Sequence, residues 1–189
     1  MVTPEELESA VAAVIEVLSE RTAAGEWDSA AGDLEWSCWQ TAAHVAHDLN
    51  AYALQVAASP QDGYLPVDLA VRADVPPSGL LVVIASTARL LSAAVVATSS
   101  QSRAWHWGPT DPGGFIALGC NEVLVHGYDI ARGLGIDWKP PAPLASAVLD
   151  RLFPDAPEGD PGAVLLWCTG RSALGARPRR TSWVPVAAL

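Results

Sequence analysis

The chain has 189 residues, half of them hydrophobic, and a formal net charge of −10. This length and apolar content fit a single folded domain and exclude a disordered chain. The acidic balance argues against nucleic acid as a partner, because neutralising phosphates requires clustered lysine and arginine. The three cysteines are far apart, which argues against a disulfide framework or a zinc knuckle and favours a reducing cytoplasm. They are Cys38, Cys120 and Cys168.

The sequence shows no clear membrane-targeting or membrane-spanning segment. Residues 1–6 have neither the basic segment nor the apolar run of a signal peptide. The most apolar stretch, residues 80–96, contains Arg89 and is barely long enough to cross a bilayer. We therefore expect a buried helix here and a cytoplasmic protein that does not use a membrane as a partner.

Four long helices are predicted in chain order. The first begins at Pro4, where Thr3 and Glu6 have the spacing of a capping box, and it ends before Gly25. Its apolar residues recur at helical spacing, as do those of the later segments. The other three are expected over residues 38–58, 78–98 and 112–134. The third is apolar nearly all round, which is typical of a central helix.

A shorter C-terminal part follows these helices. We expect a fifth helix over residues 143–153, a strand or extended segment over 163–168 and an irregular tail over 171–189. The predicted fold is all-α: a four-helix bundle over residues 1–140, with a short extension over residues 141–189 packed on it.

The fourth helix carries a polar strip beside its apolar stripe. Glu122 and His126 are four residues apart, so their side chains lie on one face, one turn from each other. Asp129 continues the strip, and Gly119 and Gly133 flank it, which is expected to leave space beside the two polar side chains. Alone, such a Glu–His pair is typical of an exposed helix surface.

The second helix carries a similar strip, in which His44 and Asp48 are one turn apart. An imidazole that binds a metal through one nitrogen commonly donates its other N–H to a carboxylate, so Asp48 is expected to orient His44. His47 lies about 60° away around the helix and is an alternative ligand. Together the two helices supply two histidines and one glutamate, a set that suits a catalytic Zn²⁺ with an open coordination position.

Two segments resemble the signatures of a known family. Residues 36–44, WSCWQTAAH, resemble the tryptophan-to-histidine signature of the N-terminal domain of mycothiol-dependent maleylpyruvate isomerases, which is a DinB-like domain. Residues 121–135, NEVLVHGYDIARGLG, resemble its second signature. The resemblance covers roughly residues 5–135 and implies a four-helix bundle that holds a divalent metal ion through His, Glu and His.

On this match the metal ligands are His44, Glu122 and His126. His44 is preferred to His47 because Trp36 takes the place of the signature tryptophan. If Trp39 took that place, His47 would be the ligand.

The resemblance also implies a function. We expect an isomerase or S-transferase that uses Zn²⁺ and a low-molecular-weight thiol, mycothiol, to act on a small electrophilic substrate. In this reading Asp48 orients His44, and Asp129 is either a general base or a support for His126. An acid on the helix surface without a role in the site is the alternative for Asp129. The residues after about 140 are too few for the second domain of the full-length isomerase, which argues against maleylpyruvate isomerisation itself.

Two other interpretations stay open at this point. One is a non-catalytic bundle that binds a metal or a small molecule, and the other is a purely structural bundle with surface His–Glu pairs. A homodimer is compatible with each of them.

Two further clusters have alternative interpretations. Residues 105–107, WHW, are expected either to wall a pocket or to cover one end of the bundle. The C-terminal arginines are expected either to bind a substrate carboxylate or, as is more common for a solvated tail, to pair with nearby acids. They are Arg171, Arg177, Arg179 and Arg180.

Overall fold

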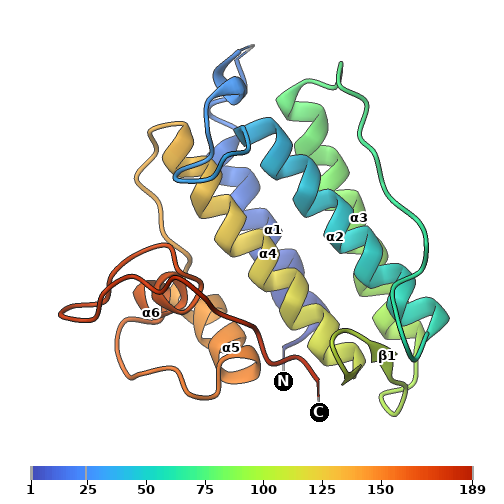
Figure 1. The fold of residues 1–189 in the computed structure, drawn as a ribbon. Helices are drawn as coiled ribbons and strands as arrows, with labels where there is room; N and C mark the ends of the chain where they lie inside the picture. The colour runs from blue at the N-terminus through green and yellow to red at the C-terminus, as the bar shows by residue number, and fades with distance from the viewer. Residues whose placement is uncertain (1, 24, 189) are drawn as a thin grey trace.

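The computed structural model describes residues 2–23 and 25–188, and four long helices dominate it (Figure 1). They are α1 (Pro4–Leu18), α2 (Cys38–Ala58), α3 (Pro77–Ala97) and α4 (Pro112–Gly133). Both α1 and α2 pack against α3 and α4, which closes the bundle around a shared core. The predicted all-α bundle is confirmed, and the predicted bounds of α2, α3 and α4 agree with the structure to within a residue or two.

Side-chain caps set where three of these helices begin. In α1 the Thr3 hydroxyl accepts from the Glu6 N–H at 3.3 Å, and the Glu6 carboxylate accepts from the Thr3 N–H at 2.8 Å. Ser37 and Gln40 form the same reciprocal box at the start of α2. Asp111 caps α4 by accepting from the Gly114 N–H at 2.7 Å. Each cap satisfies N–H groups that the helix itself leaves without a partner.

The remaining elements are short. A 3₁₀ turn, η1 (Glu26–Asp28), lies between α1 and α2, and a two-stranded antiparallel hairpin, β1 (Ala104–Trp105) with β2 (Pro109–Thr110), lies between α3 and α4. The C-terminal part contains α5 (Ala142–Leu152) and α6 (Pro161–Cys168). The strand or extended segment predicted over residues 163–168 is therefore wrong. Asp160 caps α6 just as Asp111 caps α4, and this Asp-Pro-Gly start outweighs the ambiguous apolar run.

The position of α3 also differs from expectation. It is the one helix in the described residues long and apolar enough to cross a membrane. Here it packs on α1, α2 and α4, but only one of its faces is buried. Val82, Leu90 and Val96 are more than half exposed, so α3 forms an outer wall of the bundle rather than its centre.

The C-terminal part packs on the bundle beside α4, on the side away from α3 (Figure 1). Buried side chains of α5 and α6 belong to the same apolar cluster as those of the bundle. Arg151 ties the tail to the bundle, since it donates to the Asp111 carboxylate at 3.0 Å and to the Ala187 carbonyl at 2.6 Å. The tail is irregular, as predicted, and returns across α5.

Candidate metal centre

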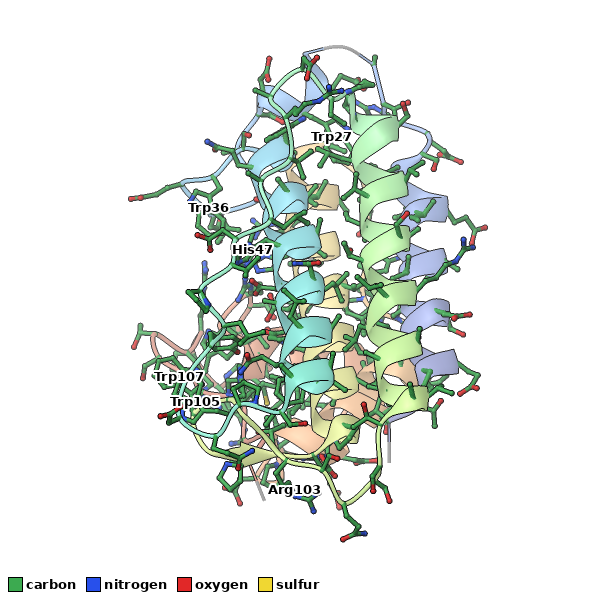
Figure 2. The ribbon with its side chains drawn as sticks, turned by 90° about the vertical axis from the view of Figure 1, so that its right-hand side faces the viewer. Trp27, Trp36, His47, Arg103, Trp105 and Trp107 are labelled. Atoms are coloured by element: carbon green, nitrogen blue, oxygen red, sulfur yellow. The ribbon has the colours of Figure 1, made fainter. Side chains whose placement is uncertain are left out.

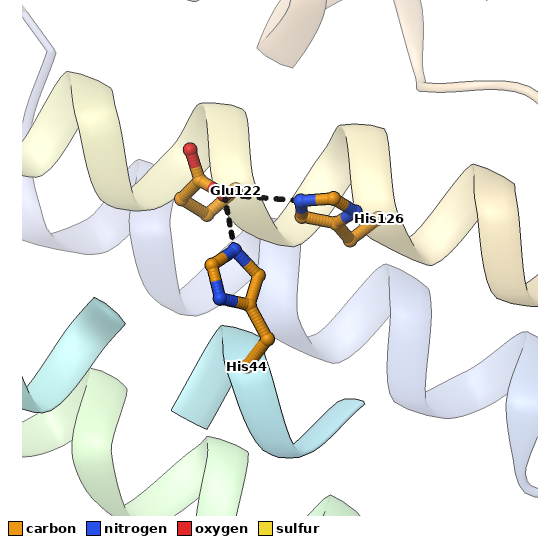
Figure 3. A group of neighbouring side chains, drawn as sticks. All are labelled: His44, Glu122 and His126. Atoms are coloured by element: carbon orange, nitrogen blue, oxygen red, sulfur yellow. Dashed lines mark ion pairs between the residues drawn. The ribbon is translucent and has the colours of Figure 1, made fainter. Parts of the chain in front are cut away.

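Three polar side chains from two helices converge at one place (Figure 3). His44 comes from α2, while Glu122 and His126 come from successive turns of α4. One potential ligand atom from each lies within 4.8 Å of the others. The Glu122 Oε2 atom is 3.7 Å from His44 Nε2 and 3.3 Å from His126 Nε2. The packing of α2 on α4 thus brings together the residues that the sequence predicted as a ligand set.

The His126 ring is held on both sides. Its Nε2 faces Glu122, and its Nδ1 lies 3.0 Å from the Asp129 Oδ2 atom. Arg171, from the tail that follows α6, donates to the same Asp129 oxygen at 2.9 Å. This arrangement leaves Nε2 free to bind a metal while a carboxylate fixes the ring orientation through the other nitrogen.

Asp129 is nearly fully buried, with 3% of its side chain exposed. Burial raises its pKa, but the hydrogen bonds from His126 and Arg171 outweigh that effect and lower the pKa. A carboxylate engaged by two donors and stabilised in its charged form is poorly suited to accept a further proton. The geometry therefore favours a support for His126 over a general base, the two roles expected from the sequence.

Asp48 lies differently from the predicted arrangement. Its Oδ2 atom is 3.4 Å from His44 Nε2, which is the same nitrogen that faces Glu122. Asp48 therefore borders the centre itself and does not hold the far nitrogen of the His44 ring, as had been expected. The reason is that α2 turns the Nε2 edge of His44 toward α4, so the i+4 carboxylate meets this edge as well.

The charges of the cluster are strongly coupled. Burial alone would lower the pKa of His126, but its hydrogen bonds with Asp129 and Glu122 raise it to about 9. Burial would raise the pKa of Glu122, yet the two histidines lower it well below its usual range. Burial and the Glu122 charge raise the pKa of Asp48 to about 6.

The donor set fits a divalent cation. Two imidazole nitrogens and one deprotonated carboxylate oxygen, all facing one point, match the ligand types that Zn²⁺ prefers. The His44 side chain is 29% exposed, whereas Glu122 and His126 are more buried, so the centre is reachable from the His44 side.

The alternative histidine is engaged elsewhere. His47 Nδ1 accepts a hydrogen bond from the Leu69 N–H at 3.2 Å, and its Nε2 lies 4.0 Å from the exposed Asp68 carboxylate. In Figure 2 His47 lies along the outer edge of α2, beside the connection between α2 and α3. The structure thus brings His44, and not His47, to Glu122 and His126.

The two candidate signature tryptophans separate in the same way. The Trp36 ring packs against His44, with centroids 4.9 Å apart. Trp39 instead donates from its indole N–H to the Val75 carbonyl at 2.8 Å and anchors the α2–α3 connection.

The glycines beside the polar strip do not leave empty space. A Cβ at Gly119 would lie 3.0 Å from Leu91 and 3.1 Å from Leu49, both core residues. A Cβ at Gly133 would collide with the Ala30 carbonyl and with Cys38. These glycines allow close packing of neighbouring elements, and the prediction of open space beside the ligands is wrong.

The C-terminal arginines pair with acids or aromatic rings. Arg179 donates to Asp33 at 2.5 Å, and Arg171 is held by Asp129. Arg177 and Arg180 lie over the Trp167 ring. Of the two interpretations drawn from the sequence, the geometry matches pairing with acids. Arg171 also supports the centre through Asp129, a contact that spacing along the chain could not predict.

The WHW segment helps to line a cavity next to the centre. His106 and Trp107 face it together with Asp48 from α2 and Tyr64 from the α2–α3 connection. Nothing in the sequence pointed to Tyr64, because the connection has no periodicity that would place its side chains against α2.

Comparisons with known proteins point in the same direction. No curated protein and no solved structure was found to match the chain. The family model described as the mycothiol maleylpyruvate isomerase N-terminal domain matches residues 6–131, a span that contains His44, Glu122 and His126 but ends before α5 and α6. The match covers about two thirds of the chain, which therefore belongs to the mycothiol maleylpyruvate isomerase N-terminal domain family, within the DinB-like superfamily.

Proposed function

We propose that this chain is a divalent-metal-dependent enzyme that uses mycothiol or a similar low-molecular-weight thiol. It would either isomerise a small electrophilic substrate or transfer the thiol sulfur to it. The observation that carries the proposal is the convergence of His44, Glu122 and His126 within 4.8 Å. The buried Asp129–Arg171 pair behind His126 supports it, because metal-binding histidines characteristically have such a partner. The family description supports the thiol.

In this proposal His44, Glu122 and His126 would hold Zn²⁺, and the centre is reachable from the more exposed side of His44. A cation bound there would lower the pKa of a coordinating thiol and so supply a thiolate at neutral pH.

In the proposed reaction Asp48 transfers the thiol proton. Asp48 is the carboxylate placed beside the centre to accept the proton that leaves the thiol sulfur. Sulfur forms a bond to an unsaturated carbon of the substrate, and the displaced π electrons move to the neighbouring carbon. In S-transfer, Asp48 returns the proton to that carbon. In isomerisation, the new C–S bond breaks after rotation, and the proton returns to the sulfur.

The buried, unpaired state of Cys38, Cys120 and Cys168 supports the cytoplasm as the place where this chemistry occurs. None of these thiols is proposed as the nucleophile, since each is buried and none belongs to the cluster of His44, Glu122 and His126.

Metal analysis of the untagged protein tests the proposal. We expect about one equivalent of Zn²⁺ per chain and binding of mycothiol, measured by titration calorimetry, only to the metal-loaded protein. His44→Ala is expected to lose both. His47→Ala is the matched control and is expected to keep both, because His47 lies outside the cluster. Unchanged metal content in His44→Ala would contradict the assignment of His44 as a metal ligand.

Turnover separates the enzyme from the binding module. Full metal and thiol binding without consumption of any thiol–electrophile pair would favour the non-catalytic alternative.

A further inference from the structure

The cavity beside the centre has a volume of about 310 Å³. It lies between the α2 face that carries Asp48, the α2–α3 connection and the loop between β1 and β2. Asp48 joins the two features, because it lines the cavity while its Oδ2 atom is 3.4 Å from His44. A molecule in the cavity therefore lies next to the proposed metal centre.

The walls of this cavity are tied together by side chains. Buried Gln55 donates to the Gly63 carbonyl at 3.1 Å and to the Trp105 carbonyl at 2.8 Å, and it accepts from the Leu65 N–H at 3.2 Å. One α2 side chain thus fixes both the connection and the β1–β2 hairpin. Tyr64 and His106 close the wall through a hydrogen bond between the Tyr64 hydroxyl and the His106 Nδ1 atom. The cavity is preformed, as small-molecule sites usually are.

The lining is largely aromatic, and His47 also borders the cavity, with its Nε2 atom 4.0 Å from the Asp68 carboxylate. Tyr52, Tyr64 and Trp107 present their rings, and the carboxylates that border the cavity are Asp48 and Asp68. None of the described residues that line it is a lysine or an arginine. Burial lowers the pKa of His106 to about 4, so this imidazole adds no positive charge near neutral pH.

The arginines nearest the centre do not change this balance. Arg171 is paired with Asp129, and Arg132 and Arg179 are both paired with Asp33; none of the three lines the cavity. A carboxylate substrate in the cavity would face Asp48 and the exposed Asp68, with no guanidinium or ammonium among the lining residues. A Zn²⁺ in the centre would be offset by the charges of Glu122 and Asp48, so it would not make the cavity positive, and the arrangement disfavours anions.

We propose that this cavity binds the electrophilic substrate, and that this substrate is an uncharged molecule carrying an aromatic ring or a conjugated double bond rather than a carboxylate. That this ligand is the substrate rests on the proposed function, whereas its chemical class follows from the cavity itself. An uncharged substrate would also distinguish this chain from an enzyme that isomerises maleylpyruvate, because maleylpyruvate is a dicarboxylate.

A matched pair of probes tests the ligand class. Cinnamamide and cinnamate share a ring and a double bond but differ in charge, and titration calorimetry or ligand-observed NMR measures both. We expect cinnamamide to bind the full chain at least ten-fold more tightly than cinnamate. Asp48→Asn is expected to narrow that ratio. Equal or tighter binding of cinnamate would overturn the proposal.

A second pair of variants tests the location. Ala51 lines the cavity, whereas Ala57 is exposed on the same helix outside it. Ala51→Phe is expected to weaken cinnamamide binding at least ten-fold, and Ala57→Phe to leave it unchanged, with equal helix content by circular dichroism in both. Equal binding by the two variants would place the probe elsewhere and refute the site.

The role as a substrate site has its own readout. Cinnamamide is expected to compete with dimethyl fumarate in a mycothiol-consumption assay, raising the apparent KM without changing kcat. Non-competitive behaviour would contradict a substrate site. Cinnamamide binding is measured separately from the metal and thiol titrations. A failure of those titrations would contradict the proposed function, whereas a failure of the cinnamamide tests would contradict this inference.

Discussion

At the scale of single residues, the environment of His126 depends on a residue far away in the chain. Arg171 donates to both oxygens of Asp129, and Asp129 contacts the His126 Nδ1 atom. The arginine lies outside the residues that match the family model. The C-terminal part of this chain therefore contributes to the orientation of a proposed ligand.

We expect Arg171→Gln to weaken Zn²⁺ binding about 10- to 100-fold. The reason is that the substitution removes the guanidinium charge that keeps Asp129 ionised and in position beside His126. A chelator-competition titration measures the affinity. Arg177→Gln is the control, since Arg177 contacts the Trp167 ring and not Asp129. Arg171→Lys is expected to recover part of the affinity. Equal affinities for Arg171→Gln and Arg177→Gln would show that the Arg171–Asp129 pair is only structural.

His106 gives a second prediction at this scale. Burial lowers its pKa from 6.5 to about 4, so between these values the unfolded chain binds a proton that the folded chain does not. Stability is therefore lost as the pH falls through this window. From pH 7 to pH 4.5 the wild type is expected to lose about 2 kcal/mol more unfolding free energy than His106→Gln.

Urea titrations at the two pH values measure this difference. The same pH slope for His106→Gln and the wild type would show that His106 is not held neutral by the fold.

At the scale of elements, the contact between α1 and α4 depends on the absence of a side chain. A Cβ at Gly127 of α4 would lie 2.6 Å from the Val14 Cγ2 atom of α1. Val14 is β-branched and buried, so its rotamer is restricted and it cannot move aside easily. The two helices therefore approach more closely here than a larger residue would permit.

Gly127→Ala is expected to destabilise the protein by about 1 to 2 kcal/mol, because the overlap outweighs the gain in helix propensity. In a Val14→Ala background the same change is expected to stabilise, since the space is open and alanine favours the helix. Chemical unfolding of the four proteins forms a double-mutant cycle. Additive effects would refute the proposed overlap.

Element boundaries were largely predictable from local signals. Thr3 with Glu6 and the Pro4 that follows the cap marked α1, and Pro60 lies just beyond the end of α2. The error at residues 163–168 arose because a six-residue apolar run fits a strand and a buried helix equally well. The Asp160-Pro161 start, a local signal for the beginning of a helix, resolves this ambiguity in favour of α6.

At the scale of the whole molecule, one apolar cluster runs through the bundle and through α5 and α6. Trp27 is buried near the N-terminal end of α2, and Trp183 packs on Phe153 in the C-terminal part. We expect these regions to unfold together, because neither has a core separate from the other. Urea transitions followed by tryptophan fluorescence and by far-UV circular dichroism should then coincide. A separate early transition for the C-terminal part would contradict this.

The sequence alone determined the helices and the donors, because capping, periodicity and i,i+4 spacing are local properties of the chain. It placed Glu122 and His126 on one face and offered His44 and His47 as alternatives. Only the tertiary structure decided which histidine meets Glu122, which carboxylate supports His126, and that Tyr64 and His106 close a cavity beside Asp48. The physical reason is that these contacts join α2, α4, the connection and the tail, and the distances between such elements are set by core packing rather than by spacing along the chain.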